Sequence, residues 1–196
     1  HTYTYASTER IDYLDYLIAN TPSQFEKAFL LSAGTEATEV ALKLMRLNGE
    51  KNSKRKRGII CFEGAYHGRT MGAQMMTGSI PAKEWIGFQD PNIHHLPFPY
   101  PWEEGVKDPK EFFIKSLNNL SKKHNLNLDE DICGIMLETF QGWGGIFYPK
   151  NFIKEVASFA KERGILIAFD EMQAGFGRTG ELFGYSHYEV EPDLLC

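Results

Sequence analysis

Residues 165–180 read I-L-I-A-F-D-E-M-Q-A-G-F-G-R-T-G, and this run indicates the class of fold. Its apolar part, residues 165–169, has the length and composition of a buried β-strand. Asp170, Glu171 and Gln173 follow at the carboxyl end of that strand. A buried carboxylate requires a cationic or hydrogen-bonding partner, so we expect Asp170 to hold one.

Other apolar runs precede this strand, and helical patterns lie between them. Strands that alternate with helices predict an α/β fold, in which a mostly parallel sheet has helices on both faces. The expected strands are residues 29–31, 58–62, 93–96 and 132–137, and the expected helices follow residue 35, cover about 70–76, and begin near 109 and 151.

Two helix boundaries carry clear signals. Asp108-Pro109-Lys110-Glu111 combines an N-cap residue, a first-turn proline and a capping-box acid, so a helix should begin there. Gly164 should end the helix that begins at Asn151. Apolar residues at helical spacing should face the core: Ala37, Val40, Ala41 and Leu44; Phe113, Leu117 and Leu120; and Phe152, Val156, Phe159 and Ala160.

The composition excludes several classes of protein. The chain is 42% hydrophobic and 24% charged, as in a globular protein, and its net charge of −5 argues against nucleic-acid binding. The basic residues within 51–57 are interpreted as a solvated loop. Cys61, Cys133 and Cys196 share no close spacing, which argues against a disulfide framework and favours a reducing compartment, the cytoplasm. No apolar stretch approaches transmembrane length and no signal peptide is visible, so we expect no membrane partner.

Chemically rich segments follow four of the expected strands. They are residues 32–36, 63–68, 138–142 and 170–173. In parallel sheets ligands bind beyond the carboxyl ends of the strands, so the four segments should meet in one composite site.

Gly34 and Thr35 lie between a strand-like run and a strong helical pattern. A helix amino terminus offers free N–H groups, and a glycine lets a ligand approach the backbone, which suits a phosphate. The alternative is a plain threonine N-cap. The segment lacks the second glycine and the lysine of a P-loop, so we expect a single phosphate.

Tyr66 and His67 lie between two glycines after the strand at 58–62. An aromatic ring there can stack on a flat cofactor, or Tyr66 can simply cap the core. We count His67 among the residues of the cofactor site, where it can also act as a structural hydrogen-bonding residue. It lacks partners at the spacing of a metal site.

Residues 175–180 match the dinucleotide pattern G-x-G-x-x-G. That pattern should turn directly from a strand into a helix. Here five residues intervene after the strand, and residues 181–187 have no apolar helical face. We therefore do not expect a nicotinamide or flavin cofactor.

Together these segments resemble the class III aminotransferases, which are pyridoxal-phosphate enzymes of fold type I. The resemblance depends most on residues 169–180, on 66–68 and on the phosphate loop at 32–37. It implies that residues 1–196 are an incomplete large, cofactor-binding domain. The opening at His1 rather than Met and the end at Cys196 within an apolar run agree with an internal piece of a longer protein.

The resemblance also implies roles for individual residues. Asp170, the catalytic residue, would pair with the pyridine nitrogen of pyridoxal 5'-phosphate and keep it protonated. Gln173 would bind the phenolic oxygen, Tyr66 would stack on the ring, and Gly34 and Thr35 would hold the phosphate. Glu138 would orient Asp170 or His67 from behind the cofactor, whereas Glu171 and Arg178 would be structural.

Two departures bear on the substrate. Glu138-Thr139 stands where the family often has Glu-Pro, and Trp143 stands where many members have an acid that pairs with an arginine. Trp143 cannot make that ion pair, which favours a bulkier amine pocket or pyruvate as acceptor over a dicarboxylate. The implied substrates are a primary amine or ω-amino acid and a 2-oxo acid, and the implied assembly is a homodimer.

The resemblance places the Schiff-base lysine beyond Cys196, so residues 1–196 alone should not transaminate. An aminomutase or a decarboxylase on the same scaffold stays open as an alternative. A truncated, non-enzymatic partner of a true subunit is the alternative from another class.

Overall fold

The computed structural model describes residues 5–103 and 106–196, and the chain forms two compact units, His1–Ser32 and Ala33–Cys196. The first unit contains one helix, α1 (Thr8–Ala19), which begins where the Ser7 hydroxyl accepts a hydrogen bond from the Arg10 amide. Within the described part of the chain, no helix is both long and apolar enough to cross a membrane.

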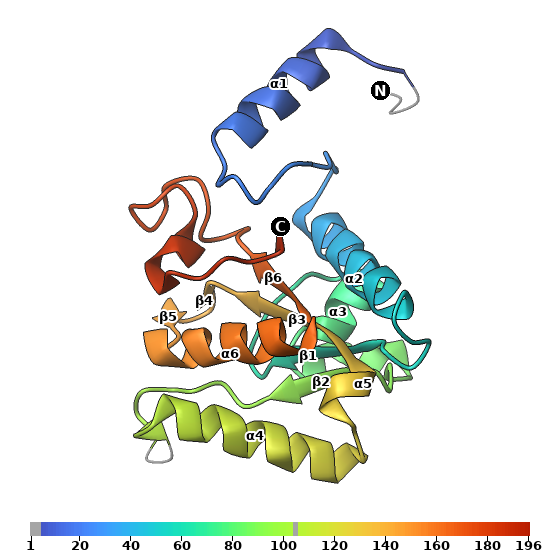
Figure 1. The fold of residues 1–196 in the computed structure, drawn as a ribbon, viewed down its shortest axis with the longest axis vertical. Helices are drawn as coiled ribbons and strands as arrows, with labels where there is room; N and C mark the ends of the chain where they lie inside the picture. Colours follow the sequence, from blue (N-terminus) through green and yellow to red (C-terminus); the bar gives the residue numbers. More distant parts are fainter. Residues whose placement is uncertain (1–4, 104–105) are drawn as a thin grey trace. The chain divides into compact units, whose positions relative to one another are not determined.

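The second unit is built on a five-stranded parallel sheet (Figure 1). Its order is β2-β1-β3-β6-β7, and every neighbouring pair is parallel. The strands are β1 (Gly58–Phe62), β2 (Ile93–Leu96), β3 (Ile132–Glu138), β6 (Leu166–Asp170) and β7 (Leu194–Leu195). A separate antiparallel pair, β4 (Phe140–Gln141) and β5 (Ile146–Phe147), follows β3. The predicted α/β class is confirmed.

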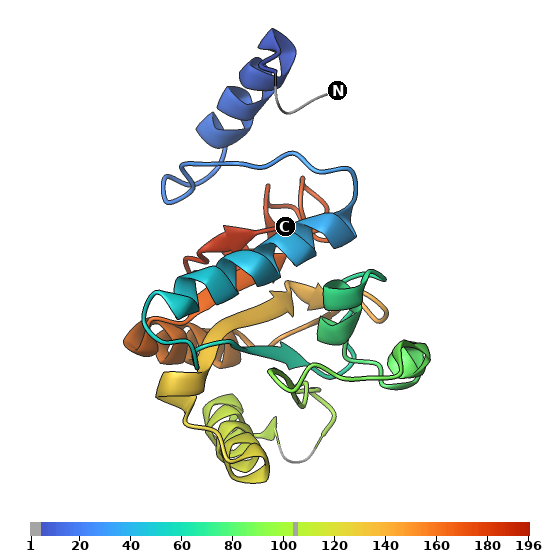
Figure 2. The same ribbon diagram turned by 90° about the vertical axis from the view of Figure 1, so that its right-hand side faces the viewer.

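Helices cover both faces of the sheet, as Figures 1 and 2 show together. One face carries α2 (Gly34–Glu50) and the short α3 (Met71–Met76), and the other carries α4 (Pro109–His124) and α6 (Lys150–Arg163). A one-turn helix, α5 (Leu128–Asp131), leads into β3, and 3-10 turns cover Pro81–Ile86 and Gly184–Tyr188.

Each face has its own core. Beneath α2, the side chains of Ala41, Leu42 and Met45 pack against β1, β3 and β6. On the opposite face the core is aromatic: Phe152 of α6 lies 5.8 Å from Phe62 of β1, measured between ring centroids. This two-sided burial explains why the strands read as continuous apolar runs.

The local signals for α4 and α6 are confirmed. Asp108 caps α4 by accepting hydrogen bonds from the amides of Lys110 and Glu111 at 2.9 and 3.1 Å. Gly164 ends α6 in the left-handed conformation, with φ of 59°. The expected inward residues of α4 (Phe113, Leu117 and Leu120) are all buried.

Three expectations were wrong in detail. Residues 29–31 form no strand, because none of the five strands pairs with them and three apolar residues make no ladder alone. The buried face of α2 is rotated: Ala41 is buried as expected, but Ala37, Val40 and Leu44 are only partly buried. Their places are taken by Thr38, Leu42 and Met45. Phe159 of α6 is also only partly buried, and its ring lies beneath the Arg163 guanidinium at 4.4 Å.

Candidate active site

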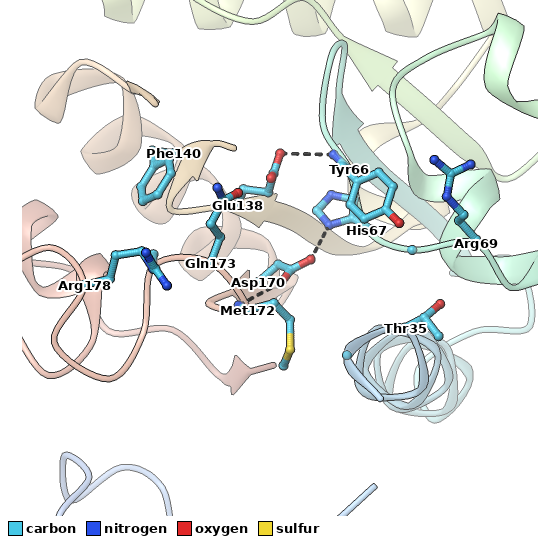
Figure 3. A pocket seen from close by; sticks show the side chains of 13 residues that line it. Thr35, Tyr66, His67, Arg69, Glu138, Phe140, Asp170, Met172, Gln173 and Arg178 are labelled. Atoms are coloured by element: carbon cyan, nitrogen blue, oxygen red, sulfur yellow. Dashed lines mark hydrogen bonds and ion pairs between the residues drawn. The ribbon is translucent and has the colours of Figure 1, made fainter. Parts of the chain in front are cut away.

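A cavity of about 480 Å³ opens at the carboxyl edge of the sheet, which is the size of a small-molecule site. All seven residues predicted for cofactor binding line it: Gly34, Thr35, Tyr66, His67, Glu138, Asp170 and Gln173. Figure 3 shows Tyr66 and His67 on one side, Gln173 and Arg178 on the other, and Asp170 between them. The four predicted segments therefore contribute to one cavity, although the segment at 32–36 does not follow a strand.

Asp170 is the last residue of β6 and is 6% exposed. Its Oδ2 lies 2.9 Å from His67 Nδ1, and its Oδ1 accepts a hydrogen bond from the Met172 amide at 3.2 Å. A carboxylate has about four acceptor positions, so these two contacts leave capacity for a cationic donor in the cavity.

His67 is held on three sides. Its amide donates to the Thr77 hydroxyl at 3.0 Å, its carbonyl accepts from the Thr38 hydroxyl at 2.7 Å, and its ring contacts Asp170. The ring is buried, and Nε2 has no hydrogen-bond partner among the described residues. No cluster of three or more potential metal ligands occurs in residues 5–103 and 106–196. The contacts of its amide, carbonyl and ring support a hydrogen-bonding role for His67.

Glu138 lies opposite Asp170 in the register of β3 and β6. Its Oε2 accepts from the Tyr66 amide at 3.1 Å, and its Oε1 accepts from the Gly142 amide at 3.2 Å. Burial raises the pKa of Glu138 to about 7, although His67 opposes that shift. We expected this acid to orient Asp170 or His67, but its recorded bonds go to two backbone amides. The neighbouring charge of Asp170 also raises the pKa of Glu138, while the two amide donors lower it.

Tyr66 stands at the mouth of the cavity with 52% of its surface exposed. Its ring therefore does not cap the core, which was the alternative interpretation. The Arg69 guanidinium lies 5.7 Å from the centre of the ring. Since Glu138 holds the Tyr66 amide, the backbone beneath this ring is anchored to β3.

Helix α2 begins at the cavity. Its N-cap is Ala33, whose methyl side chain cannot accept a hydrogen bond, so the plain threonine N-cap is excluded. Thr35 lies inside the first turn, where its hydroxyl is 2.9 Å from the Thr70 hydroxyl. A Cβ added to Gly34 would lie 2.6 Å from Met172 Sδ, so the glycine permits a close approach between the two segments.

Residues 171–183 form turns and bends, so the backbone there differs from the strand–turn–helix of a dinucleotide-binding pattern. Glu171 is buried and accepts hydrogen bonds from the amides of Gly184 and Tyr185 at 2.8 and 2.7 Å and from the Thr139 hydroxyl. It therefore organises the loop, as expected. Gln173 reaches the Gly142 carbonyl through Nε2 at 3.4 Å.

Trp143 does not line the cavity. Its side chain is largely exposed, and its indole N–H donates to Gln141 Oε1 at 2.9 Å. Tyr100 donates to the same oxygen at 2.8 Å. Trp143, Gln141 and Tyr100 thus form a polar and aromatic cluster.

Sequence reasoning missed several residues of the site. Arg69, Phe140 and Met172 line the cavity, and Thr70 and Glu39 support Thr35 from behind. Glu39 offered no local signal, because on a helix its charge is typical of a solvated face. Met172 could have been suspected from its place between Asp170 and Gln173.

The whole chain, residues 1–196, matches the family model described as aminotransferase class-III. The chain belongs to this family. It is 35% identical to a probable 4-aminobutyrate aminotransferase of Bacillus subtilis (strain 168), over 94% of this chain and 42% of that protein.

Solved structures of aminotransferases share the fold. An (S)-enantioselective omega-transaminase from Thermomicrobium roseum superposes with a TM-score of 0.87 at 31% identity, covering 98% of this chain and 44% of that one. A taurine:2-oxoglutarate aminotransferase from Bifidobacterium kashiwanohense, solved with PLP and glutamate, gives 0.85 at 25% identity, covering 100% and 44%. The chain therefore spans less than half the length of these class III relatives.

Proposed function

We propose that the full-length protein moves an amino group from a primary amine or ω-amino acid to a 2-oxo acid by means of pyridoxal 5'-phosphate. One observation carries the proposal: the buried Asp170–His67 pair and the amino terminus of helix α2 line the same cavity. A cationic ring nitrogen suits the first of these features, and a phosphate suits the second. Residues 1–196 would then form part of the cofactor-binding domain.

The residues fit such a cofactor along its length. Asp170 would hold the pyridinium nitrogen, Gln173 the phenolic oxygen and Tyr66 one face of the ring. The amides at Gly34 and Thr35 would hold the phosphate. When bound, the cofactor supplies an electron sink for the carbanion formed at the amine carbon.

The protein contributes position and charge to this chemistry. Asp170 would hold the ring nitrogen in its protonated form, and its carboxylate is itself held by His67 and by the Met172 amide. His67 is fixed by Thr77 and Thr38, so the acid cannot rotate freely away from the ring. Such preorganisation lets the charge act without rearrangement during the reaction.

Trp143 guides the choice of substrates. Its uncharged indole cannot form an ion pair with an arginine, and its N–H is hydrogen-bonded to Gln141. We therefore propose a hydrophobic or bulky amine donor, with pyruvate rather than a dicarboxylate as acceptor. We propose a cytoplasmic homodimer as well. Free Cys61, Cys133 and Cys196 support a reducing compartment. The exposed side chains of Met172, which lines the cavity, and of Phe176 and Leu182 in the loop after it support cover by a second subunit.

The test is a spectroscopic assay of the full-length protein. It is mixed with candidate amines, with pyruvate or 2-oxoglutarate as acceptor, while the cofactor's absorbance and the ketone or aldehyde product are followed. Amine-dependent spectral change with carbonyl product supports transamination. Release of carbon dioxide would replace this proposal with decarboxylation, and an isomerised amine would replace it with an aminomutase.

A matched pair of variants ties the reaction to the site. Asp170→Asn should lower kcat by at least a hundredfold, because a neutral amide does not stabilise the protonated ring nitrogen. Asp108→Asn makes the same chemical change at the α4 cap, where asparagine is an equally good cap, and should leave activity unchanged. Full activity in Asp170→Asn would refute the assigned role.

A further inference from the structure

Glu39 of α2 reaches across to the start of α3. Its Oε1 accepts hydrogen bonds from the amides of Gly72 and Ala73 at 2.8 and 3.0 Å and from the Thr70 hydroxyl at 2.6 Å. Thr70 is the N-cap residue of α3, yet its own side chain makes no capping bond. The cap is therefore supplied by a carboxylate from another helix. A Cβ on Gly72 would collide with Glu39 Oε2, so the glycine makes this approach possible.

The donors in this cluster can be assigned from chemistry. A carboxylate only accepts, so the single hydroxyl proton of Thr70 is given to Glu39. In the 2.9 Å contact between Thr70 and Thr35 the proton must then come from Thr35. The result is a chain of two hydrogen bonds, here called the relay, in which Thr35 donates to Thr70 and Thr70 donates to Glu39.

The relay changes what Thr35 can do at the cavity. Its hydroxyl proton points to Thr70, and its oxygen also lies 3.4 Å from the Thr70 amide. The side chain rests against Gly68, where any Cβ would overlap it. Thr35 thus ties the first turn of α2 to the segment 66–70, and an anion at this end would meet backbone amides rather than the hydroxyl.

We propose that Glu39 is a positioning residue for the phosphate end of the site, acting through Thr70 on Thr35. This inference rests on the function proposed above. By holding the start of α2 against the segment that carries Tyr66 and His67, Glu39 would set the spacing between the phosphate amides and the ring-binding residues.

The negative charge of Glu39 and the position of its acceptor oxygen have opposite expected effects on phosphate binding. Its negative charge lies close to the place proposed for a phosphate and would by itself weaken anion binding. Glu39→Gln retains an oxygen that accepts from Thr70 and from the two amides, but removes the charge. A positioning role therefore predicts that glutamine preserves phosphate binding, whereas Glu39→Ala, which removes the acceptor, weakens it.

The experiment compares two ligands on the full-length apoprotein: pyridoxal 5'-phosphate and pyridoxal, which lacks the phosphate. Dissociation constants are measured by equilibrium dialysis for the wild type and for the variants Glu39→Gln, Glu39→Ala, Thr70→Ser and Thr70→Val. Asp108→Asn is the control acid, since it caps α4 away from the cavity.

The informative quantity is the ratio of the two dissociation constants. We expect Thr70→Val and Glu39→Ala to lower the preference for the phosphorylated ligand about five- to tenfold, the range of one hydrogen bond. The variants Thr70→Ser, Glu39→Gln and Asp108→Asn should keep the wild-type preference for the phosphorylated ligand. Thr70→Val nearly preserves shape and spares the Gly72 and Ala73 amides, so it decides the matter alone if Glu39→Ala does not fold.

Two failures are distinguishable. If Thr70→Val weakens the binding of both ligands by the same factor, the relay only supports packing and the positioning role is overturned. The same conclusion holds if the binding of neither ligand changes. If the wild type itself does not prefer the phosphorylated ligand, the phosphate assignment of the proposed function falls first.

Discussion

Glu138 and Asp170 stand directly opposite each other at the ends of β3 and β6, and each holds a different part of the cavity wall. Asp170 binds His67 and the turn at Met172, whereas Glu138 binds the amides of Tyr66 and Gly142. Asp170 thus holds the parts of the cavity wall at His67 and Met172, and Glu138 holds the part at Tyr66.

The raised pKa of Glu138, about 7, makes stability depend on pH. Its carboxyl binds a proton more tightly in the folded than in the unfolded protein, so this group favours folding most at acidic pH. That contribution is lost as pH rises from about 4.5 to about 7, at about 1.4 kcal/mol per unit of pKa difference. Urea unfolding of the apoprotein at pH 5 and pH 8 should show a larger loss for wild type than for Glu138→Gln. An equal loss would contradict the shift.

Gly34→Ala tests the close approach at the start of α2. The new methyl group would overlap Met172, but that side chain is flexible and more than half exposed, so it can move. We therefore expect a change in unfolding free energy of less than about 1 kcal/mol, offset by the better helix propensity of alanine. Binding of pyridoxal 5'-phosphate should weaken several-fold, as measured by dialysis. Recovery in the double variant with Met172→Ala would confirm that Met172 is displaced into the cavity.

Gly68 and Gly145 form a matched pair of left-handed glycines. At Gly68, φ is 131° and an added Cβ would strike Thr35, whereas at Gly145, φ is 62° and no atom lies within 4 Å of the added Cβ. Gly68→Ala should lower the unfolding free energy by about 2–3 kcal/mol because of backbone strain and overlap with Thr35. Gly145→Ala should lower it by about 1 kcal/mol because of backbone strain alone. Thermal unfolding checks the difference, and equal costs would show that the contact with Thr35 is unimportant.

Glu171 should matter for stability more than for ligand binding. Glu171→Ala leaves the buried amides of Gly184 and Tyr185 without their acceptor, at a cost of about 3 kcal/mol. Glu171→Gln keeps an acceptor oxygen and should lose less. The melting temperature of each variant is the measurement. A normal melting temperature in Glu171→Ala, with lost cofactor affinity, would instead make this acid part of the binding site.

Periodicity and capping signals predicted the sheet well where the cause was local. The strands at 58–62 and 93–96 and the Asp108 cap need only the residues beside them. The strand at 29–31 failed because a strand requires a partner that a short apolar run does not reveal. The buried face of α2 was misjudged because Thr38 is buried by its bonds to the Thr35 and His67 carbonyls, which hydrophobicity does not report.

The sequence predicted which residues belong to the site, but not the hydrogen bonds that connect them. All seven expected residues share the cavity, since each lies at the end of a parallel strand, in the loop that follows one, or at the start of a helix. The hydrogen bond from the Tyr66 amide to Glu138 and the one from Thr70 to Glu39 each join residues more than thirty positions apart. Such pairings depend on side-chain placement within the assembled sheet, which no local pattern encodes.

The contact between His67 and Asp170 spans 103 positions of the chain and joins β6 to the loop after β1 across the intervening strand β3. No hairpin can bring these residues together, so the contact forms only after the strands have docked. Formation of the binding-competent pocket should therefore be a late event in folding, slowed by the loop closures it requires. A ligand that binds only the completed pocket would shift the folding equilibrium by mass action, so cofactor supply would govern how much of the newly made chain persists in the native form.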